Sequence, residues 1–280
     1  MFIYRNEHYC RLTTNQSRIQ EADAVLVSLQ DLPEHPSMWL PQDYVPAVNQ
    51  KWAGFWLEAP TRAYIFGFNI TTPKSKLEAL DGIFDWTISY RSDADIEADY
   101  RLHCYYQKTK TIDNKVYKKE SVFKIKDKSA LWVVSHCNTA SKREVYVKDL
   151  SEHLNITIYG KCNSNDKGRK KDAFQELDSY YFYLSFENSL CDEYITEKFF
   201  NILKSDTVPV VMGAPRRDYE KLAPPHSFIH ISDFNSSSKL AEYLLYLQNN
   251  QGLLFMFSCL EFKICSLNVN LNCGLAKLYR

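Results

Sequence analysis

Short apolar runs separated by polar loops are the main pattern in the first part of the chain. Residues 23–28 and 52–58 each predict a buried strand, and the second run ends on a carboxylate. Residues 84–91 alternate in part between apolar and polar positions, which predicts a third strand. Residues 107–128 are rich in lysine and show little periodicity. We therefore expect a solvated connection there and place a domain boundary at residues 125–126.

Strands and helices alternate in the second part. Strand-like apolar runs occupy residues 131–135, 156–160, 180–186 and 208–212. Residues 238–247 are a helix candidate, and apolar side chains recur at helical spacing at Val147, Leu150 and Leu154 and again at Ile195, Phe199, Ile202 and Leu203. This alternation predicts a parallel sheet covered by helices on both faces. Two such halves across a central cleft would make an α/β protein with two Rossmann-like lobes, at residues 1–125 and 126–250.

Composition excludes several classes of protein. Hydrophobic residues make up 45% of the chain and charged residues 24%, which is typical of a soluble globular protein and excludes general disorder. The 34 basic and 34 acidic residues give a net charge of zero, so we expect no nucleic-acid partner. Residues 253–260 are the best candidate for a membrane span but are too short to cross a bilayer. The first residues do not form a signal peptide.

The cysteines and glycosylation sequons point in another direction, toward an oxidising compartment. The chain has 8 cysteines, without a CxxC pair or the spacing of a zinc site. Sequons for N-glycosylation occur at Asn15, Asn69, Asn155 and Asn235. Disulfides in an oxidising lumen and buried thiols are both compatible with the cysteine count, and the sequence leaves that choice open.

Polar residues follow two of the predicted strands at the places where α/β sheets bind ligands. Arg143 stands at the start of a predicted helix after residues 131–135, and Asn188, Tyr194, Glu197 and Lys198 follow residues 180–186. An arginine and a lysine can hold a pyrophosphate, and a carboxylate can accept hydrogen bonds from ribose or sugar hydroxyls. The set therefore predicts a site for a nucleoside diphosphate. The alternative is a solvated helix face, which is the commoner place for a Glu-Lys pair.

One long motif resembles a known family. The segment Phe186-Glu-Asn-Ser-Leu-Cys-Asp-Glu-Tyr-Ile-Thr-Glu-Lys-Phe-Phe, followed by Val208-Pro-Val-Val, is similar to the signature of the α1,3-fucosyltransferases that use GDP-fucose. Further segments resemble the family in the same order, at residues 22–27, 57–60, 69–81, 84–96, 132–135, 159–160 and 223–229. The resemblance covers roughly residues 10–250 and implies the two-domain GT-B fold, with residues 251–280 as a divergent tail.

The resemblance implies inverting transfer of fucose from GDP-fucose to a hydroxyl of GlcNAc. Glu58 matches the position of the family's general base, which takes the proton of the acceptor hydroxyl. Arg143 and Lys198 match the positions that contact the phosphates. The positions that line the donor pocket are matched by Asn188, Tyr194, Glu197, Tyr183 and Tyr100, and by His136 where the family usually has asparagine.

No metal or other cofactor is expected to be required, because Arg143 and Lys198 would neutralise the diphosphate. A divalent cation such as Mn²⁺ would stimulate transfer only by pairing with GDP. The letters Asp93-Ala-Asp95 look like a metal motif, but the matching segment of the family is not a metal site. In the same segment Ser92 replaces an arginine of the family pattern.

The resemblance also bears on the acceptor and the compartment. Cys137, Cys162 and Cys191 lie where members that modify the N-glycan core have cysteines, which favours the innermost GlcNAc of an N-glycan as acceptor; Lewis-type transfer to lactosamine is the alternative. Family members act in the Golgi lumen as single-pass type II membrane proteins. Their anchor, stem and first strand precede the matched region, and we expect this chain to lack them.

Two other functions compete with transfer. The expected lack of a first strand and the histidine at position 136 raise the alternative of a catalytically inactive relative that binds a glycan or a nucleotide sugar. An NAD-dependent oxidoreductase would use a similar sheet, but the chain has neither a GxGxxG fingerprint nor a P-loop.

Overall fold

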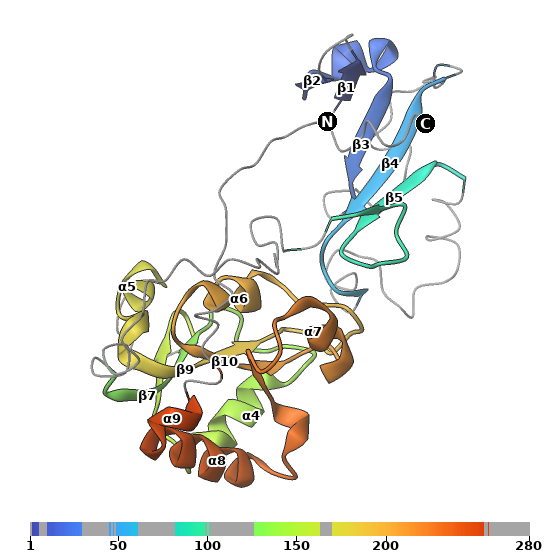
Figure 1. Ribbon diagram of the computed structural model, residues 1–280. Helices are drawn as coiled ribbons and strands as arrows, with labels where there is room; N and C mark the ends of the chain where they lie inside the picture. Colours follow the sequence, from blue (N-terminus) through green and yellow to red (C-terminus); the bar gives the residue numbers. More distant parts are fainter. Residues whose placement is uncertain are drawn as a thin grey trace, which may run out of the picture. The chain divides into compact units, whose positions relative to one another are not determined.

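The computed structural model in Figure 1 describes residues 2–5, 10–29, 45, 47, 49–60, 82–98, 100, 126–162, 170–254 and 257. It divides into two compact units, with the division after residue 99. The predicted boundary at residues 125–126 assigned Tyr100 to the first lobe, whereas the structure groups Tyr100 with the second unit. Its ring packs against a cluster that includes Phe199 and Tyr219. Most of the lysine-rich stretch lies outside the described residues.

The first unit contains a six-stranded sheet of order β2-β1-β3-β4-β5-β6. The strands are β1 (Phe2–Arg5), β2 (Cys10–Thr13), β3 (Ala24–Ser28), β4 (Lys51–Trp56), β5 (Trp86–Ser89) and β6 (Ile96–Glu97). The four strands from β3 to β6 are parallel; β3, β4 and β5 are the three predicted strands, and β6 was not predicted. β1 pairs antiparallel with both β2 and β3, so an antiparallel hairpin lies beside β3, although we expected the first strand of this lobe to be missing.

A small apolar cluster holds β3 and β4 together. Val25 and Trp52 pack with Ile19 from the 3-10 helix η1 (Gln16–Glu21). Gln50 is buried beside them, and its amide donates to the carbonyl oxygens of Ile19 at 2.6 Å and Ala22 at 2.8 Å. These bonds fix the start of β4 and hence the direction in which the strand leads to Glu58.

The second unit contains a five-stranded sheet of order β11-β10-β9-β7-β8, in which all pairs are parallel. Its strands are β7 (Lys128–Val133), β8 (Ile156–Tyr159), β9 (Tyr180–Phe186), β10 (Val208–Met212) and β11 (Ile229–His230). Every residue of β10 is buried, as is every residue of β9 except Tyr181. Continuous burial of this kind is the reason that these runs read as apolar throughout rather than alternating. The predicted parallel sheet is confirmed.

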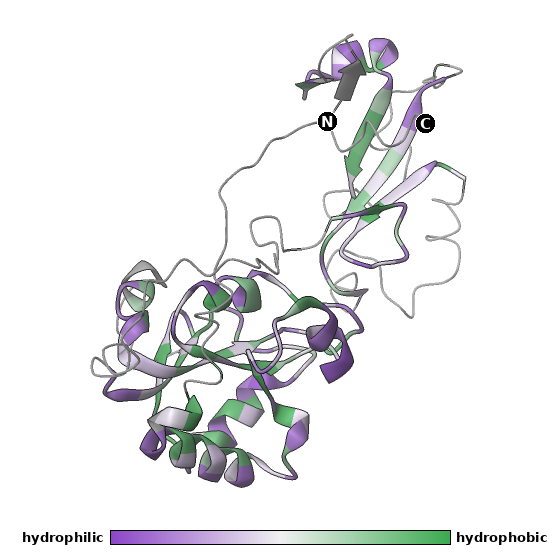
Figure 2. Ribbon diagram, in the orientation of Figure 1, coloured by the Kyte–Doolittle hydropathy of each residue, from purple (hydrophilic) through white to green (hydrophobic). Residues whose placement is uncertain are grey.

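Helices cover this sheet, and two of them form most of the core on one side. α4 (Arg143–Leu150) and α8 (Ser237–Asn249) pack together, and both bury apolar side chains in the same cluster as β7, β9 and β10. Along α8 these are Leu240, Ala241, Leu244 and Leu247, which lie on one face of the helix. Figure 2 shows hydrophobic and hydrophilic residues alternating around α8, as expected for a helix with one buried face. No helix in the described ranges is long and apolar enough to span a bilayer.

The remaining helices are short, and only α6 lies in a segment for which a helix was predicted. They are α5 (Lys170–Gln175), α6 (Glu197–Phe200), α7 (Arg216–Leu222) and α9 (Gln251–Leu254). The helix expected across residues 195–203 is one α-helical turn, α6, followed by the 3-10 helix η6 (Ile202–Lys204), because the chain must reach β10 at Val208. Ile195, Phe199 and Ile202 are still buried. The sequence did not predict α7, in which only Asp218 and Tyr219 are buried, so it carries no apolar stripe.

Candidate active site

Six of the residues predicted from the sequence line one cavity of about 240 Å³ in the second unit. They are His136, Arg143, Tyr183, Asn188, Glu197 and Lys198. The cavity lies at the carboxyl ends of β7 and β9, which are parallel neighbours. The rest of its wall is formed by Val133, Val134, Ser135, Phe174, Asn201 and Ile202. The parallel sheet therefore gathers at one edge the two groups of polar residues that are separated in the sequence.

Arg143 is a buried cation at the start of α4. Its side chain donates to the carbonyl oxygen of Phe186 at 2.6 Å and to that of His136 at 3.2 Å, and the guanidinium lies 5.9 Å from the ring centre of Trp132. Burial lowers the pKa of Arg143, but an arginine stays protonated at neutral pH. Among the described residues, its Nε and Oδ1 of Asn188 are buried without a hydrogen-bond partner. Such atoms are costly unless a ligand satisfies them.

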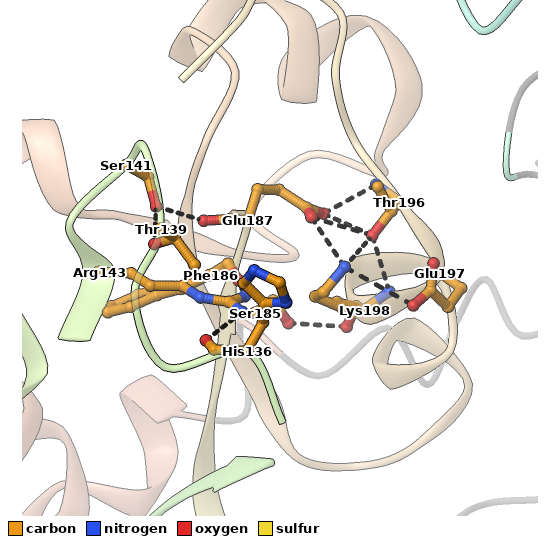
Figure 3. Close-up of polar contacts among 10 residues, drawn as sticks. All are labelled: His136, Thr139, Ser141, Arg143, Ser185, Phe186, Glu187, Thr196, Glu197 and Lys198. Atoms are coloured by element: carbon orange, nitrogen blue, oxygen red, sulfur yellow. Dashed lines mark hydrogen bonds and ion pairs between the residues drawn. The ribbon is translucent and has the colours of Figure 1, made fainter. Parts of the chain in front are cut away.

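Lys198 is held by the buried carboxylate of Glu187, and Figure 3 shows the contacts of Lys198 with Glu187 and Thr196. Its Nζ lies 3.0 Å from Oε2 of Glu187 and 2.8 Å from Oγ1 of Thr196. The backbone N–H and the hydroxyl of Thr196 donate to Oε1 of Glu187 at 2.9 and 2.8 Å. Burial raises the pKa of Glu187, while Lys198 and Thr196 oppose that shift. The Glu187 side chain is 0% exposed and that of Lys198 is 25% exposed. The ammonium of Lys198 is therefore held by a buried carboxylate and is still accessible from the cavity.

Glycine at position 213 makes room for this carboxylate. A Cβ atom added there would lie 2.7 Å from Cγ of Glu187 and 2.9 Å from its Cβ. Gly213 directly follows β10, and the backbone N–H of Glu187 donates to the carbonyl oxygen of Met212 at 2.7 Å. Only a residue without a side chain allows the end of β10 to pass so close to Glu187.

The loops at the cavity are cross-linked to one another. The Ser141 hydroxyl donates to the carbonyl oxygen of Glu187 at 2.7 Å, and its backbone N–H to that of Asn188 at 3.1 Å. A disulfide between Cys137 and Cys162 joins the loop after β7 to the loop after β8. For these two residues the structure answers the question that the sequence left open: they form a disulfide. Cys191 is a half-buried thiol, and the side chains of the other cysteines lie outside the described residues.

Gly160, just before this disulfide, is also required by its surroundings. Its φ of +100° is in the region that favours glycine, and a Cβ atom there would lie 2.3 Å from the carbonyl oxygen of Val134. The backbone N–H of Val134 donates to the carbonyl oxygen of Tyr159 at 2.9 Å. The loop that carries His136 is therefore fixed to β8 both by backbone contacts and by the disulfide.

Three predicted residues lie elsewhere. Tyr194 is buried in the loop before α6, and Tyr100 packs against a neighbouring apolar cluster; neither is among the residues that line the cavity. Glu58 is half-buried in the first unit, two residues after the end of β4, and its carbonyl oxygen accepts a hydrogen bond from Nε1 of Trp56. It therefore follows the carboxyl end of a central parallel strand, as the sequence predicted.

Within the described ranges, no group of three or more His, Cys, Asp or Glu side chains could hold a metal ion. The carboxylates of Asp93 and Asp95 accept hydrogen bonds from different residues. Asp93 accepts from Arg91 at 2.6 and 2.7 Å, and Asp95 accepts from the N–H and hydroxyl of Thr87 at 2.7 and 2.8 Å. These contacts lower the pKa of both carboxyls.

Sequence reasoning missed two features of the site. Glu187 stands within the motif that carries the resemblance. A glutamate at a strand end is usually exposed to solvent, so the residue type alone does not predict that Glu187 is buried. Phe174 comes from α5, in a stretch without apolar periodicity, and its ring stacks on Tyr183 with centroids 6.1 Å apart. Nothing in the sequence around Phe174 distinguishes it from a core residue.

Sequence comparison identifies the family. Residues 3–101 match the pattern described as fucosyltransferase, N-terminal, and residues 123–258 match that of glycosyltransferase family 10 (fucosyltransferase) C-term. The chain belongs to glycosyltransferase family 10. Both halves of the family pattern are present and in order, as the resemblance of the motifs predicted.

Several curated members of family 10 are similar to this chain. The 3-galactosyl-N-acetylglucosaminide 4-alpha-L-fucosyltransferase FUT3 of Bos taurus is 38% identical over 244 residues, which are 86% of this chain and 61% of the relative. The 4-galactosyl-N-acetylglucosaminide 3-alpha-L-fucosyltransferase FUT5 of Homo sapiens is 36% identical over 236 residues, which are 84% and 58%. The chain thus spans about three fifths of the length of these relatives.

Solved structures confirm the fold class. A crystal structure of an alpha1,3-fucosyltransferase with GDP-fucose superimposes with a TM-score of 0.54 and 19% identity, covering 84% of this chain and 68% of that chain. A crystal structure of an alpha1,3-fucosyltransferase without a named ligand gives 0.53 and 20%. The prediction of an α/β fold of the GT-B class, with one Rossmann-like sheet in each unit, is therefore confirmed for this family 10 member.

Proposed function

We propose that this chain transfers L-fucose from GDP-fucose in α1,3 linkage to a GlcNAc of a glycoprotein glycan. The observation that carries the proposal is the cavity that holds Arg143, Lys198 and Asn188 together, with buried atoms of Arg143 and Asn188 that lack partners in the described structure. These are groups that bind a diphosphate, and Asn188 and Lys198 belong to the motif that carries the family resemblance. The names of the similar proteins support fucose as the transferred sugar.

The two cations would act mainly on the leaving group. When the bond between the anomeric carbon and the β-phosphate oxygen breaks, negative charge builds on the phosphate of the departing GDP. A cation fixed beside that oxygen stabilises the transition state more than the ground state. Lys198 meets this requirement because Glu187 and Thr196 hold its ammonium in place before the substrate arrives.

Glu58 is our candidate for the general base. Its carboxylate would take the proton of the acceptor hydroxyl while that oxygen attacks the anomeric carbon from the face opposite GDP, which inverts the configuration. We propose that no metal ion is needed, because Arg143 and Lys198 supply positive charge to the diphosphate. A divalent cation such as Mn²⁺ would then stimulate the reaction only by pairing with GDP.

For the acceptor we favour the innermost GlcNAc of an N-glycan. The support is the disulfide between Cys137 and Cys162, since cysteines at these places are a mark of members that modify the N-glycan core. The names of FUT3 and FUT5 favour the second candidate, a galactosyl-GlcNAc unit as in lactosamine. In either case we propose action in the Golgi lumen, where such glycans are built.

The deciding experiment is a transfer assay with GDP-fucose and two acceptors, an N-glycan with its chitobiose core and lactosamine. It would compare the unchanged chain with Lys198→Met and with Lys239→Met, a matched control that removes an exposed lysine from α8. We expect transfer by the unchanged chain and the control, and a loss of at least 100-fold in Lys198→Met. A folded chain that binds GDP but transfers to neither acceptor would contradict the proposal and indicate an inactive relative.

A further inference from the structure

The donor cavity has two chemically different parts along β9. Arg143 donates to the carbonyl oxygen at the end of this strand, and Lys198 is paired with the next residue, Glu187. Tyr183 lies on the same face of β9 as Glu187 but four residues earlier. At about 3.3 Å per residue, this places the two positions roughly 13 Å apart along the strand. A ligand that lies along β9 from Glu187 to Tyr183 thus passes from charged to aromatic surroundings.

The part near Tyr183 is apolar. Tyr183, Val133 and Ile202 belong to one cluster, in which Ala173 anchors α5 to the sheet. The residue after Ala173 is Phe174, whose ring stacks on Tyr183 at 27° between the ring planes. Tyr183 is buried, and burial raises the pKa of its hydroxyl, so it remains neutral. The nearest charged side chain of the cavity wall is Glu197, a carboxylate that acts on the Tyr183 hydroxyl and would repel a phosphate.

Phe174 is the only exposed large hydrophobic residue of the described part of the chain that also lines this cavity. It is 38% exposed although it lines the cavity and contacts a buried ring. Tyr183 fixes one side of the phenyl ring, and the exposed remainder is presented to the cavity. An aromatic ring that is held against a second ring and exposed at a cavity offers an apolar face to a flat ligand.

We infer that Phe174 is the residue on which the purine base of the donor nucleotide stacks. The inference rests on the proposed function, because it assumes that the cavity holds a nucleoside diphosphate. With the phosphates at Arg143 and Lys198, the base of a ligand lying along β9 reaches the part of the cavity that Phe174 and Tyr183 form. Stacking of a base on an aromatic ring is worth roughly a 5- to 150-fold change in affinity, and every base offers a face for it.

The test is equilibrium binding of GDP and of inorganic pyrophosphate to the full chain. Phe174→Leu keeps an apolar side chain of similar size but removes the π face, and Phe174→Tyr restores it. We expect Phe174→Leu to weaken GDP binding at least 5-fold and leave pyrophosphate binding unchanged, while Phe174→Tyr binds GDP as the unchanged chain does. Tyr246→Leu is the control, since Tyr246 is an exposed aromatic residue of α8 and does not line the cavity.

Three outcomes would overturn the inference. The first is that Phe174→Leu binds GDP as tightly as the unchanged chain. The second is that Phe174→Leu weakens the binding of GDP and of pyrophosphate equally. The third is that the unchanged chain binds no GDP at all. The last result would also end the proposed function. GDP binding that depends on Phe174 in a chain without transfer activity would instead support the stacking role and reject only the proposed transfer.

Discussion

At the scale of single residues, the site depends on one carboxylate that is hidden from solvent. The sequence indicated Arg143, Asn188 and Lys198, because cations and amides after a strand are the groups that bind phosphates. It did not indicate Glu187, which determines where Lys198 points. Burial depends on what packs from other segments, here Thr196 and Gly213, and the sequence around Glu187 carries no trace of those contacts.

Replacement of Glu187 by glutamine tests this dependence. Glu187→Gln keeps the shape but removes the charge that pairs with Lys198, so we expect a loss of about 1–3 kcal/mol in the free energy of unfolding and at least 10-fold in transfer. Glu242→Gln is the control, because it removes a carboxylate from an exposed ion pair with Lys239 on α8 and does not line the cavity. Urea unfolding and a GDP-fucose transfer assay give the two readouts. Equal effects of the two variants would contradict the role given to Glu187.

Gly213 provides a second test at the same scale. Gly213→Ala places a methyl group against the buried Glu187 side chain, and overpacking of this kind costs about 1–3 kcal/mol. Gly252→Ala is the matched control, because a Cβ atom at that position of α9 meets nothing within 4 Å. Alanine favours a helix over glycine, so the control should be neutral or more stable by up to about 1 kcal/mol. Thermal unfolding of both variants would reveal the difference, and a stable Gly213→Ala would refute the steric argument.

At the scale of elements, strands were predicted better than helices. The runs that became β3, β9 and β10 are apolar at nearly every position, which is the mark of strands buried in a parallel sheet. The helix expected through residues 195–203 failed because its apolar spacing also fits α6 followed by a 3-10 turn. In both arrangements the same residues reach the core, so hydrophobic periodicity does not distinguish them.

The loops at the donor cavity should be stabilised by their disulfide. The bond between Cys137 and Cys162 closes a loop across 25 positions, and its loss should lower the free energy of unfolding by about 3 kcal/mol. We expect the double variant Cys137→Ser with Cys162→Ser to unfold at a lower temperature and to show no further shift with dithiothreitol. A melting temperature of the unchanged chain that does not respond to dithiothreitol would contradict this expectation.

A buried histidine, His230, should make the stability of the second unit depend on pH. His230 caps the 3-10 helix η7 (Ile231–Asp233): its Nδ1 accepts from the N–H of Ser232 at 3.1 Å, and its Nε2 donates to the carbonyl oxygen of Ala214 at 3.1 Å. Both ring nitrogens are therefore used by the neutral form. Burial lowers the pKa of His230 below its ordinary value of 6.5, although Asp233 opposes the shift.

The sign of the effect follows from this lowered pKa. The unfolded chain binds the proton more readily than the folded one, so the stabilisation is complete above about pH 6.5 and is lost as the pH falls below it. We expect the melting temperature to fall between pH 7.5 and 5.5, and to fall less in His230→Gln, which keeps a neutral polar side chain. Equal falls in the two proteins would show that His230 does not contribute.

At the scale of the whole molecule, the proposed chemistry is divided between the two units. Arg143, Asn188 and Lys198 belong to the second, and Glu58 follows a strand of the first. The prediction of two α/β lobes came from the alternation of strands and helices in the second part and was extended to the first part, where the sequence predicted only strands. The placement of Tyr100 in the second unit could not be predicted, since it depends on packing against Phe199 and Tyr219 that no local pattern reveals.

This division predicts that binding and transfer can be separated. Glu58→Gln should leave the affinity for GDP within about 2-fold of the unchanged chain, because the residue lies outside the unit that forms the donor cavity. The same variant should reduce transfer by about 10²–10⁴-fold if Glu58 is the general base. Calorimetry with GDP and a transfer assay measure the two quantities. Transfer at the normal rate would exclude Glu58 from the reaction.

The contact between Gly213 and Glu187 also constrains how the sequence can drift over generations. A first substitution at position 213 meets the buried carboxylate, and a first substitution at position 187 by a smaller residue leaves Lys198 without its anchor. Either single step lowers fitness before a second can compensate, so the pair can change only through a disfavoured intermediate. We therefore expect lineages descended from this sequence to keep or exchange these two residues together, and to vary freely at positions such as Gly252 that face open space.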